Sequence, residues 1–370
     1  MLKKLLTITL ALTLSVGAFA QDLEETLSNL LQDNATMYVQ PLGDGMGALM
    51  NSGYYHRAKV HKMLGFDFGV KLMALAFDDD SKFFNFALPS GNLSFNLNSV
   101  TDAYGNLGSI DIPFEEVYLN ANTIVPTVAG DKKEVGTVAV NDSNLIGYIE
   151  NELEAKLTTQ LGSAAAAQLA VSGLSSDITS AVGALPDIDI PGLGLSAMAL
   201  PMPQLALGLP MGIELTFRGL PERDLGDAGS FSMYGGGARV NVDQFIPIPL
   251  FPLDITAGAF YSTMAIGEVF ESNNTTVGLQ VGKSLNLLIF GIGIYADAAY
   301  EMSDVTISYE PDPSAGIGTD PIEFTLETDP GMRFGGGLHL KLIPLTYINL
   351  HVSQTPSSMV ATAGLGITFR

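Results

Sequence analysis

The sequence predicts an all-β protein: a transmembrane barrel of 12–14 antiparallel strands with an N-terminal helical segment and an Ala-rich helical insert. Apolar and polar residues alternate over runs such as 64–77 and 358–369, far longer than the roughly 5–6 residues usual in globular strands. The face opposite the apolar residues is polar or glycine, as expected for a wet lumen inside a lipid-facing band. A secretory signal precedes these runs. Together these observations disfavour the alternative, a soluble β-sandwich.

Residues 1–20 have the parts of a signal peptide. Lys3 and Lys4 precede the apolar stretch Leu5–Gly17, and Ala18-Phe19-Ala20 is a small-x-small cleavage site. We predict cleavage after Ala20 and location in the outer membrane of a Gram-negative cell. A membrane anchor is the weaker interpretation, because a spanning helix needs roughly 20 apolar residues. No later segment is apolar enough for such a helix.

Charge and composition exclude several classes of function. The chain has 17 Lys+Arg and 39 Asp+Glu, and loss of Lys3 and Lys4 with the signal peptide changes the formal net charge from −22 to −24. An acidic chain disfavours nucleic acid as a partner, because nucleic acid requires a basic face. The sequence has no Cys, which excludes a disulfide scaffold, a thiol catalyst and a Cys-ligated metal.

Residues 63–370 are predicted to form the barrel. Eight alternating spans can be read back from the C-terminus: 358–369, 346–354, 322–342, 288–309, 274–286, 253–266, 229–242 and 204–218. Residues 64–77 add a further strand. The range 83–140 holds shorter candidates broken by Pro89, Pro113 and Pro126. Because both ends of a bacterial barrel normally lie on the periplasmic side, the count should be even, and we expect 12 or 14.

Residues 21–62 are predicted to be a helical plug segment. Asp22 is a plausible N-cap, and Leu23, Leu27, Leu30 and Leu31 follow at helical spacing. These leucines must be buried somewhere, and acidic lumen groups could pair with the basic stretch. Its members are His56, Arg57, Lys59, His61 and Lys62. The alternatives are a solvated stretch and a tail in the periplasm that awaits a partner protein.

Residues 145–182 are predicted to be a helical insert. Ile149, Leu153, Leu157 and Leu161 lie four residues apart, and an Ala run follows. We expect a helix or helix pair broken near Gly173, on the periplasmic side or in the lumen. A flexible Ala/Ser/Gly linker is the alternative.

Polar side chains on the minor face of the strands are the candidate lumen lining. They are Asp67, Lys71, Glu214, Arg218, Asp254, Asp297, Glu301, Arg333, His339, Lys341, Asn349 and His351. His339 and His351 could lie close across a hairpin, but a two-His metal site lacks a third ligand, so lumen polarity is preferred. Asp78-Asp79-Asp80-Ser81 is better explained as a solvated loop tip than as a cation site. We therefore predict no metal, no cofactor and no catalytic residue.

Pro210 interrupts the regular run 204–218. Proline has no N–H for the ladder and is normally kept out of central strands. We expect a bulge or kink here, which could form a lateral opening in the wall. The alternative is a strand that begins only at Met211.

Three stretches carry a resemblance: residues 38–47 (YVQPLGDGMG), Asn51-Ser52-Gly53, and residues 201–221 (PMPQLALGLPMGIELTFRGLP). They resemble an uncharacterised family of outer-membrane barrels from the Bacteroidota. The resemblance implies a barrel and no established activity. At the level of fold alone, a helical N-terminus before a barrel is similar to the long-chain fatty-acid channels, in which the N-terminal segment plugs the lumen.

Two functions are weighed. The first is a passive channel for small molecules, hydrophobic ligands included. The alternative is a non-enzymatic structural or accessory subunit of an envelope complex. A lipid-acting enzyme is disfavoured because no Ser-His pair is found. The expected partners are outer-membrane lipid and, during biogenesis, the barrel-assembly machinery.

Overall fold

The computed structural model describes residues 32–88, 91–101, 103–118, 123–224, 230–246, 252–267, 270–286, 290–309, 322–343, 345–355 and 357–369. The predicted signal peptide and the leucines at 23–31 lie outside these residues. The chain divides into two compact units. Unit 1 comprises Met1–Lys82, Thr127–Asp131 and Leu193–Arg370, and unit 2 comprises Phe83–Pro126 and Lys132–Gly192.

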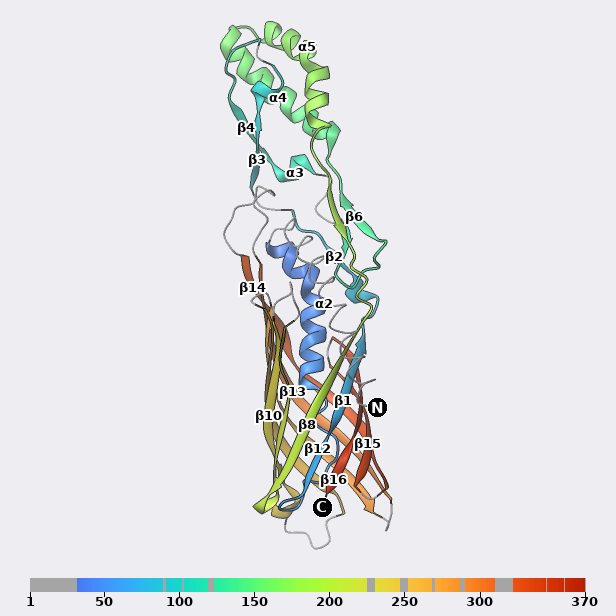
Figure 1. The fold of residues 1–370 in the computed structure, drawn as a ribbon. Helices are drawn as coiled ribbons and strands as arrows, with labels where there is room; N and C mark the ends of the chain where they lie inside the picture. Colours follow the sequence, from blue (N-terminus) through green and yellow to red (C-terminus); the bar gives the residue numbers. More distant parts are fainter. Residues whose placement is uncertain are drawn as a thin grey trace. The chain divides into compact units, whose positions relative to one another are not determined.

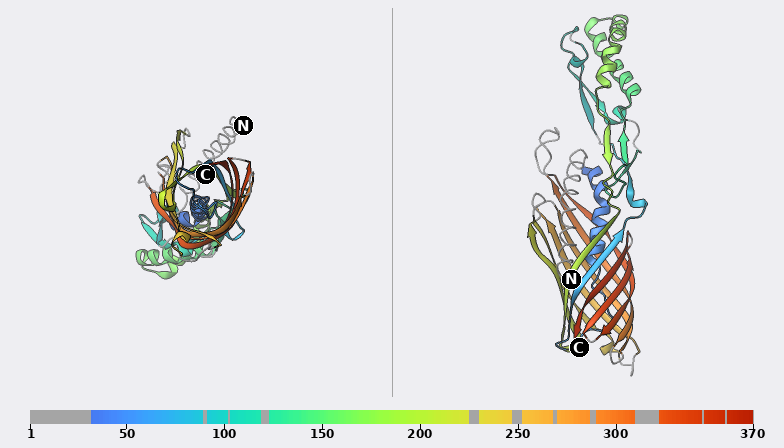
Figure 2. Two further views of the ribbon diagram at one scale, coloured as in Figure 1. Left: turned by 90° about the horizontal axis from the view of Figure 1, so that it is seen from below. Right: turned by 45° about the vertical axis from the view of Figure 1, so that its right-hand side comes forward.

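Unit 1 contains a closed antiparallel barrel, which has ten strands in the described part of the chain (Figures 1 and 2). The strands are β1 (Phe66–Ala76), β8 (Ala197–Leu209), β9 (Ile213–Asp224), β10 (Ser230–Asn241), β11 (Asp254–Ile266), β12 (Phe270–Asn286), β13 (Gly291–Tyr309), β14 (Ile322–Ile343), β15 (Thr346–Gln354) and β16 (Met359–Phe369). From β8 to β16 each strand pairs with the next in sequence, and β1 closes the ring between β16 and β8.

The predicted class is therefore confirmed, but the predicted count of 12–14 strands is wrong. Two errors produced the wrong count: one added strands that the barrel does not have, and the other merged two strands into one. The range 83–140 contributes no strand to the barrel among its described residues; its strands are only three to five residues long and pair within unit 2. The range 204–218, read as one strand, belongs to two, β8 and β9.

Pro210 lies in a turn between strands, so the predicted kink or opening of the wall is wrong. β8 ends at Leu209, residues Pro210–Gly212 form a tight 3₁₀ turn, and β9 begins at Ile213. A connection of three residues places positions of equal parity opposite each other, as in the pair Leu207 and Leu215. Paired residues point to the same face of an antiparallel sheet, so the alternation continues unbroken through the turn and imitates one long strand.

Unit 2 is inserted between β1 and β8. Three two-stranded antiparallel sheets pair β2 (Phe83–Asn85) with β5 (Ile124–Pro126), β3 (Asn92–Asn96) with β4 (Ser109–Pro113), and β6 (Val135–Val138) with β7 (Ile188–Pro191). Helices α3 (Phe114–Val117), α4 (Asp142–Leu161) and α5 (Ala164–Val182) complete it. Among the described residues, no helix is long and apolar enough to cross a membrane.

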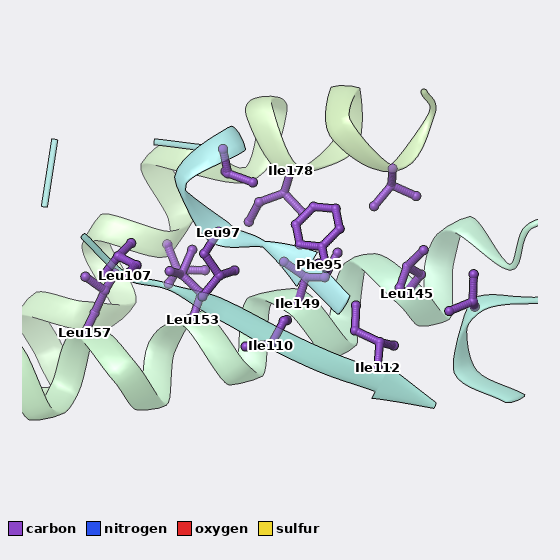
Figure 3. Packing of buried hydrophobic residues seen from close by; sticks show 14 of the residues in the cluster. Phe95, Leu97, Leu107, Ile110, Ile112, Leu145, Ile149, Leu153, Leu157 and Ile178 are labelled. Atoms are coloured by element: carbon purple, nitrogen blue, oxygen red, sulfur yellow. The ribbon is translucent and has the colours of Figure 1, made fainter. Parts of the chain in front are cut away.

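Unit 2 has its own hydrophobic core. On α4, Leu145, Ile149, Leu153 and Leu157 recur every four residues and are all 0% exposed. They pack with residues of the β3–β4 hairpin and with α5, as Figure 3 shows. Burial of this apolar stripe explains why a range of mixed composition folds as helices instead of a linker.

The break between the two helices lies at Gly162-Ser163, and the predicted break near Gly173 is wrong. Gly162 caps α4 with φ of 67°, a left-handed conformation that glycine adopts without strain. The Ser163 hydroxyl then accepts the N–H of Ala166 and caps the next helix. Gly173 lies within α5.

The insert leaves the barrel at the end opposite to the end of β16. Phe66, the first residue of β1, pairs with Phe369, whereas Ala76 pairs with Ala197 where the chain returns. The prediction of a periplasmic or lumenal insert rested on a parity count that put the insert at the end where β16 finishes. That placement is wrong, because counting β8 and β9 as one strand inverted the parity. We call the end with Phe66 and Phe369 the turn end, and the end with Ala76 and Ala197 the loop end.

Candidate functional site: an occupied lumen

Helix α2 (Gln32–Asn51) runs inside the barrel (Figures 1 and 2). Tyr38, Val39 and Met50 are all 0% exposed. Residues 21–62 were predicted to be a helical plug segment, but the helical spacing marked only its first part. Within α2 itself, Pro41 and three glycines oppose a helix: relative to Ala, Gly costs about 1 kcal/mol and Pro about 3 kcal/mol. Burial of the apolar residues against the wall therefore has to sustain the helix.

Two helix glycines allow α2 to approach the wall. A Cβ at Gly43 would lie 2.9 Å from Leu326 Cδ1, and one at Gly47 would lie 2.8 Å from Ser303 Cβ. These glycines are four residues apart and so lie on one helix face. That face contacts β13 and β14, where the side chain of a larger residue would meet Leu326 and Ser303.

We expect Gly47→Ala to lower the free energy of unfolding by about 1–3 kcal/mol, because the added methyl group overpacks the contact with Ser303. Gly173→Ala on α5 is the matched control, since a Cβ there meets nothing within 4 Å. It should raise the stability of its helix by about 0.5–1 kcal/mol. Urea titrations in detergent measure both. Equal stabilisation by the two changes would contradict the close contact.

Arginines of the wall bind the carbonyl groups at the end of α2. Arg218 donates through Nη1 to the Ser52 carbonyl at 2.6 Å and through Nη2 to that of Met50. Arg333 donates to the Asn51 carbonyl at 3.0 Å. The last carbonyls of a helix have no partner within it and carry partial negative charge. Buried guanidinium groups satisfy both requirements.

An aromatic contact holds the chain just after the helix. The guanidinium carbon of Arg218 lies 3.6 Å from the centroid of the Tyr54 ring. The Phe260 ring stacks on Tyr54 at 4.1 Å with an interplanar angle of 16°, and the Tyr55 ring meets Phe260 edge-on at 5.7 Å. Cation–π and stacking contacts of this kind stabilise a buried ring beyond the area it buries.

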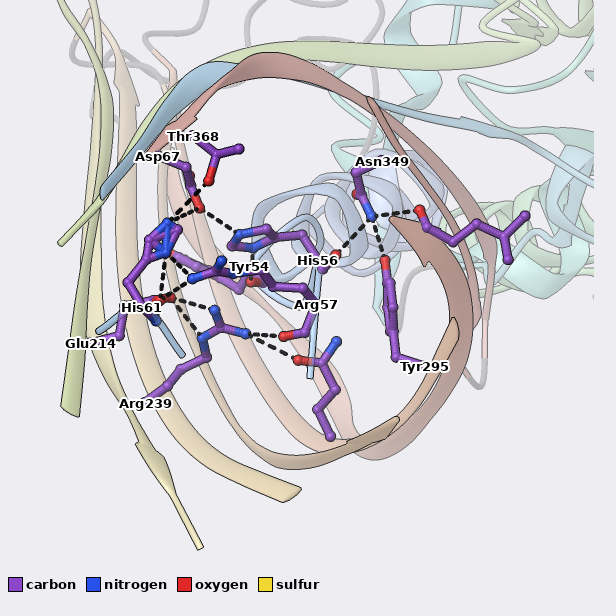
Figure 4. A network of polar contacts seen from close by, with 12 residues as sticks. Tyr54, His56, Arg57, His61, Asp67, Glu214, Arg239, Tyr295, Asn349 and Thr368 are labelled. Carbon is purple, nitrogen blue, oxygen red and sulfur yellow. Dashed lines mark hydrogen bonds and ion pairs between the residues drawn. The ribbon is translucent and has the colours of Figure 1, made fainter. Parts of the chain in front are cut away.

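Two wall carboxylates bind the basic segment 56–61 (Figure 4). Glu214 Oε2 accepts from Arg57 Nη2 and from the backbone N–H of His61, both at 2.8 Å. Glu214 Oε1 accepts from Arg239, whose Nη1 also donates to the Arg57 carbonyl at 2.8 Å. The Glu214 side chain is fully buried, where an ion pair needs several hydrogen bonds to offset its desolvation.

Asp67 on β1 is the second of these carboxylates. Its Oδ2 lies 2.9 Å from His56 Nε2 and 3.5 Å from His61 Nε2. Two strands away around the barrel, on β15, Asn349 Nδ2 donates to the His56 carbonyl at 3.0 Å and to the Tyr295 hydroxyl at 2.7 Å. Segment 56–61 is thereby joined to β1, β9 and β15 of the wall.

A further cluster of predicted lumen residues lies on β13, β14 and β15. Arg333 Nη1 is 2.9 Å from Glu301 Oε1, and its Nη2 is 3.4 Å from Asp297 Oδ2. Asp297 Oδ1 lies 2.7 Å from His351 Nε2. Arg333 therefore pairs with two carboxylates and at the same time donates to the Asn51 carbonyl of α2.

The remaining predicted residues have smaller roles. Lys71 is buried, with its ammonium 5.3 Å from the Tyr347 ring centroid. Lys59 is 57% exposed and lies 3.9 Å from Asp254 at the turn end. Lys62 is exposed and Lys341 is half-buried.

His339 and His351 make separate contacts: the first stacks on Tyr347 at 5.2 Å, the second on Tyr295 at 5.6 Å. In the described part of the chain, no group of three or more His, Asp or Glu side chains could hold a metal ion. Asp78, in the acidic run after β1, accepts from the hydroxyl and the N–H of Ser81, which holds the pKa of that carboxyl below its usual range.

Sequence reasoning missed several residues of this site, chiefly Arg239, Gln280, Tyr54 and Tyr295. Arg239 could have been found, because it shares parity with Gly235 and Gly237 on the lumen side of β10. Tyr295 carried the same signal, because it shares parity with Asp297 and Glu301 on β13. Tyr54 carried none, because it lies before the first strand and its partner comes from a distant strand.

Fold and site together define a ten-stranded barrel whose lumen is occupied by the N-terminal segment of the same chain. The chain belongs to the family of unknown function DUF6588, whose model matches residues 1–370. No curated protein matches it.

Two solved structures are similar to part of the chain. One is the N-terminal β-barrel domain of Pseudomonas aeruginosa OprF, with 14% identity, a TM-score of 0.22, and coverage of 42% of this chain and 96% of that one. The other is the KdgM porin in complex with disordered oligogalacturonate, with 11% identity, a TM-score of 0.22, and coverage of 46% of this chain and 93% of that one.

Proposed function

We propose that this protein is a closed outer-membrane barrel that anchors unit 2 at the cell surface, a structural or accessory role without enzymatic activity. The observation that carries the proposal is the occupied lumen. Tyr54, Tyr55, His56 and His61 are at most 1% exposed at the level where they cross the barrel. A passive channel would require this segment to leave, against the buried contacts of Glu214.

The outer surface supports membrane residence. Outward side chains such as Phe68, Leu72 and Leu365 are apolar and 45–57% exposed, which in water would expose a large apolar surface. On β13 the outward apolar residues end at Met302, and Asp304 follows on the same face. A band that ends in polar residues is the pattern of a lipid-facing wall, so outer-membrane lipid is the expected partner, and the barrel-assembly machinery the expected inserter.

The connectivity supports the orientation. Bacterial barrels carry short turns on the periplasmic side and long loops outside. The 3₁₀ turn Pro210–Gly212 lies at the turn end, whereas unit 2 is joined to the loop end. With the turn end in the periplasm, unit 2 belongs to the outer surface. Its separate core makes it a folded module, not a loop.

Single-channel recording in planar bilayers tests the closed lumen. The mature chain should show no steady conductance. A variant lacking residues 22–51 should show open steps, because the part of the lumen near the loop end is then empty. A variant lacking residues 22–62 should conduct more, since it also loses Arg57 and His61. Heat-modifiable migration serves as the folding control. If the mature chain conducts as well as the two deletion variants, the result would instead support the passive channel.

A further inference from the structure

The direction of α2 within the barrel can be read from its contacts. A Cβ at Gly45 would lie about 3 Å from Phe77 and Met198, which adjoin β1 and β8 at the loop end. Further toward the N-terminus, the Tyr38 carbonyl accepts the N–H of Val128. The helix rises 1.5 Å per residue, so Gln32 lies about 20 Å beyond Gly45 along its axis. The N-terminal end of α2 therefore points out of the loop end.

The other end of the segment is tied to the turn end. His61 lies beside Glu214 and Thr368, which are near the start of β9 and the end of β16. The N–H of Leu64 then donates to the Gly208 carbonyl, and the N–H of Gly208 donates to the Gly65 carbonyl. The chain thus crosses the whole lumen from the loop end to the turn end and returns in the wall as β1, as Figure 1 shows.

We infer that the N-terminal end of helix α2 opens to the outer cell surface, the side to which unit 2 is joined. This inference rests on the orientation in the proposed function. It has one consequence for the chain: the barrel must close around a segment that already points outward. Any partner that binds the N-terminal end of α2 therefore meets it outside the cell.

Single-cysteine labelling tests the inference, because the sequence has no Cys and each introduced thiol is unique. The variants are Glu24→Cys before α2, Ser172→Cys on the exposed face of α5, and Met211→Cys in the turn, where the native side chain is 79% exposed. Intact and permeabilised cells are treated with a membrane-impermeant maleimide. The expected result is labelling of Glu24→Cys and Ser172→Cys in intact cells, and of Met211→Cys only after permeabilisation.

Other outcomes separate the two proposals. Labelling of Ser172→Cys but not Glu24→Cys in intact cells, with both labelled after permeabilisation, overturns the outward opening of α2 and leaves the anchor function intact. Labelling of Met211→Cys alone in intact cells reverses the barrel, so the surface-anchor function fails and the N-terminal end of α2 faces the periplasm.

If the Glu24→Cys thiol is not labelled even in permeabilised cells, a disulfide test in the full chain determines the direction of α2. A Cβ at Gly43 would lie 3.3 Å from Leu326 Cβ, near the roughly 3.5–4.5 Å of disulfides. Gly43→Cys/Leu326→Cys should crosslink on oxidation, whereas Gly43→Cys/Lys341→Cys, with its second thiol near the turn end of the same strand, should not. Crosslinking of the control pair alone would place the helix in the reverse direction and overturn the inference.

Discussion

Replacement of Glu214 by alanine is expected to lower the free energy of unfolding by about 3–5 kcal/mol, because the loss of one member of a buried ion pair leaves its partner uncompensated. Glu214 is fully buried and accepts from Arg57, Arg239 and the N–H of His61. Its removal leaves the buried Arg239 without its carboxylate and breaks the contacts that hold Arg57 and His61 to the wall. The measurement is a urea titration in detergent, in which the gel migration of unheated samples reports the folded fraction.

Glu222→Ala is the matched control, since Glu222 lies on the same strand with an exposed side chain. It should change stability by less than about 0.5 kcal/mol. The double variant Glu214→Leu/Arg239→Leu should lose less than the sum of the two single changes, because it leaves no unpaired charge between these positions. If Glu214→Ala behaves like Glu222→Ala, the lumen network does not hold the segment.

Leu365→Arg is expected to cost about 2–4 kcal/mol, the cost of a cation near the midplane of a lipid-facing barrel wall. Leu365 is 57% exposed on the outer face of β16 and pairs with Val70 and Ile348 of the neighbouring strands. In a bilayer this side chain meets acyl chains. Folding titrations into lipid vesicles measure the loss directly.

Ser308→Arg provides the comparison. Ser308 lies on β13 beyond Asp304, where the outer face is already polar. Near the interface a cation costs only about 0–1 kcal/mol. Equal losses for the two variants would show that the outer face of the barrel does not contact hydrocarbon, and membrane residence would then have to be abandoned.

The strands could be predicted from the sequence because each has one face toward the lumen and one face on the outside of the barrel. On β13, Ile294 and Tyr300 face outward while Asp297 and Glu301 face inward, and this alternation is local information. The same locality explains the main error. Through the turn Pro210–Gly212 the alternation does not change, so nothing nearby reveals that one run is two strands, and both the count and the side of the insert depended on that turn.

Local patterns were sufficient to predict the barrel class, the two-sided strands, the buried stripe of α4 and most of the polar residues that face the lumen. The bounds of helix α2 and the pairing of charges depend on the tertiary structure. Pro41, Gly43 and Gly47 oppose a helix locally, and it forms because the lumen buries it and those glycines admit the wall. Glu214 meets Arg57 across 157 positions of sequence. This contact exists only once β1 pairs with β8, which brings the lumen segment beside β9.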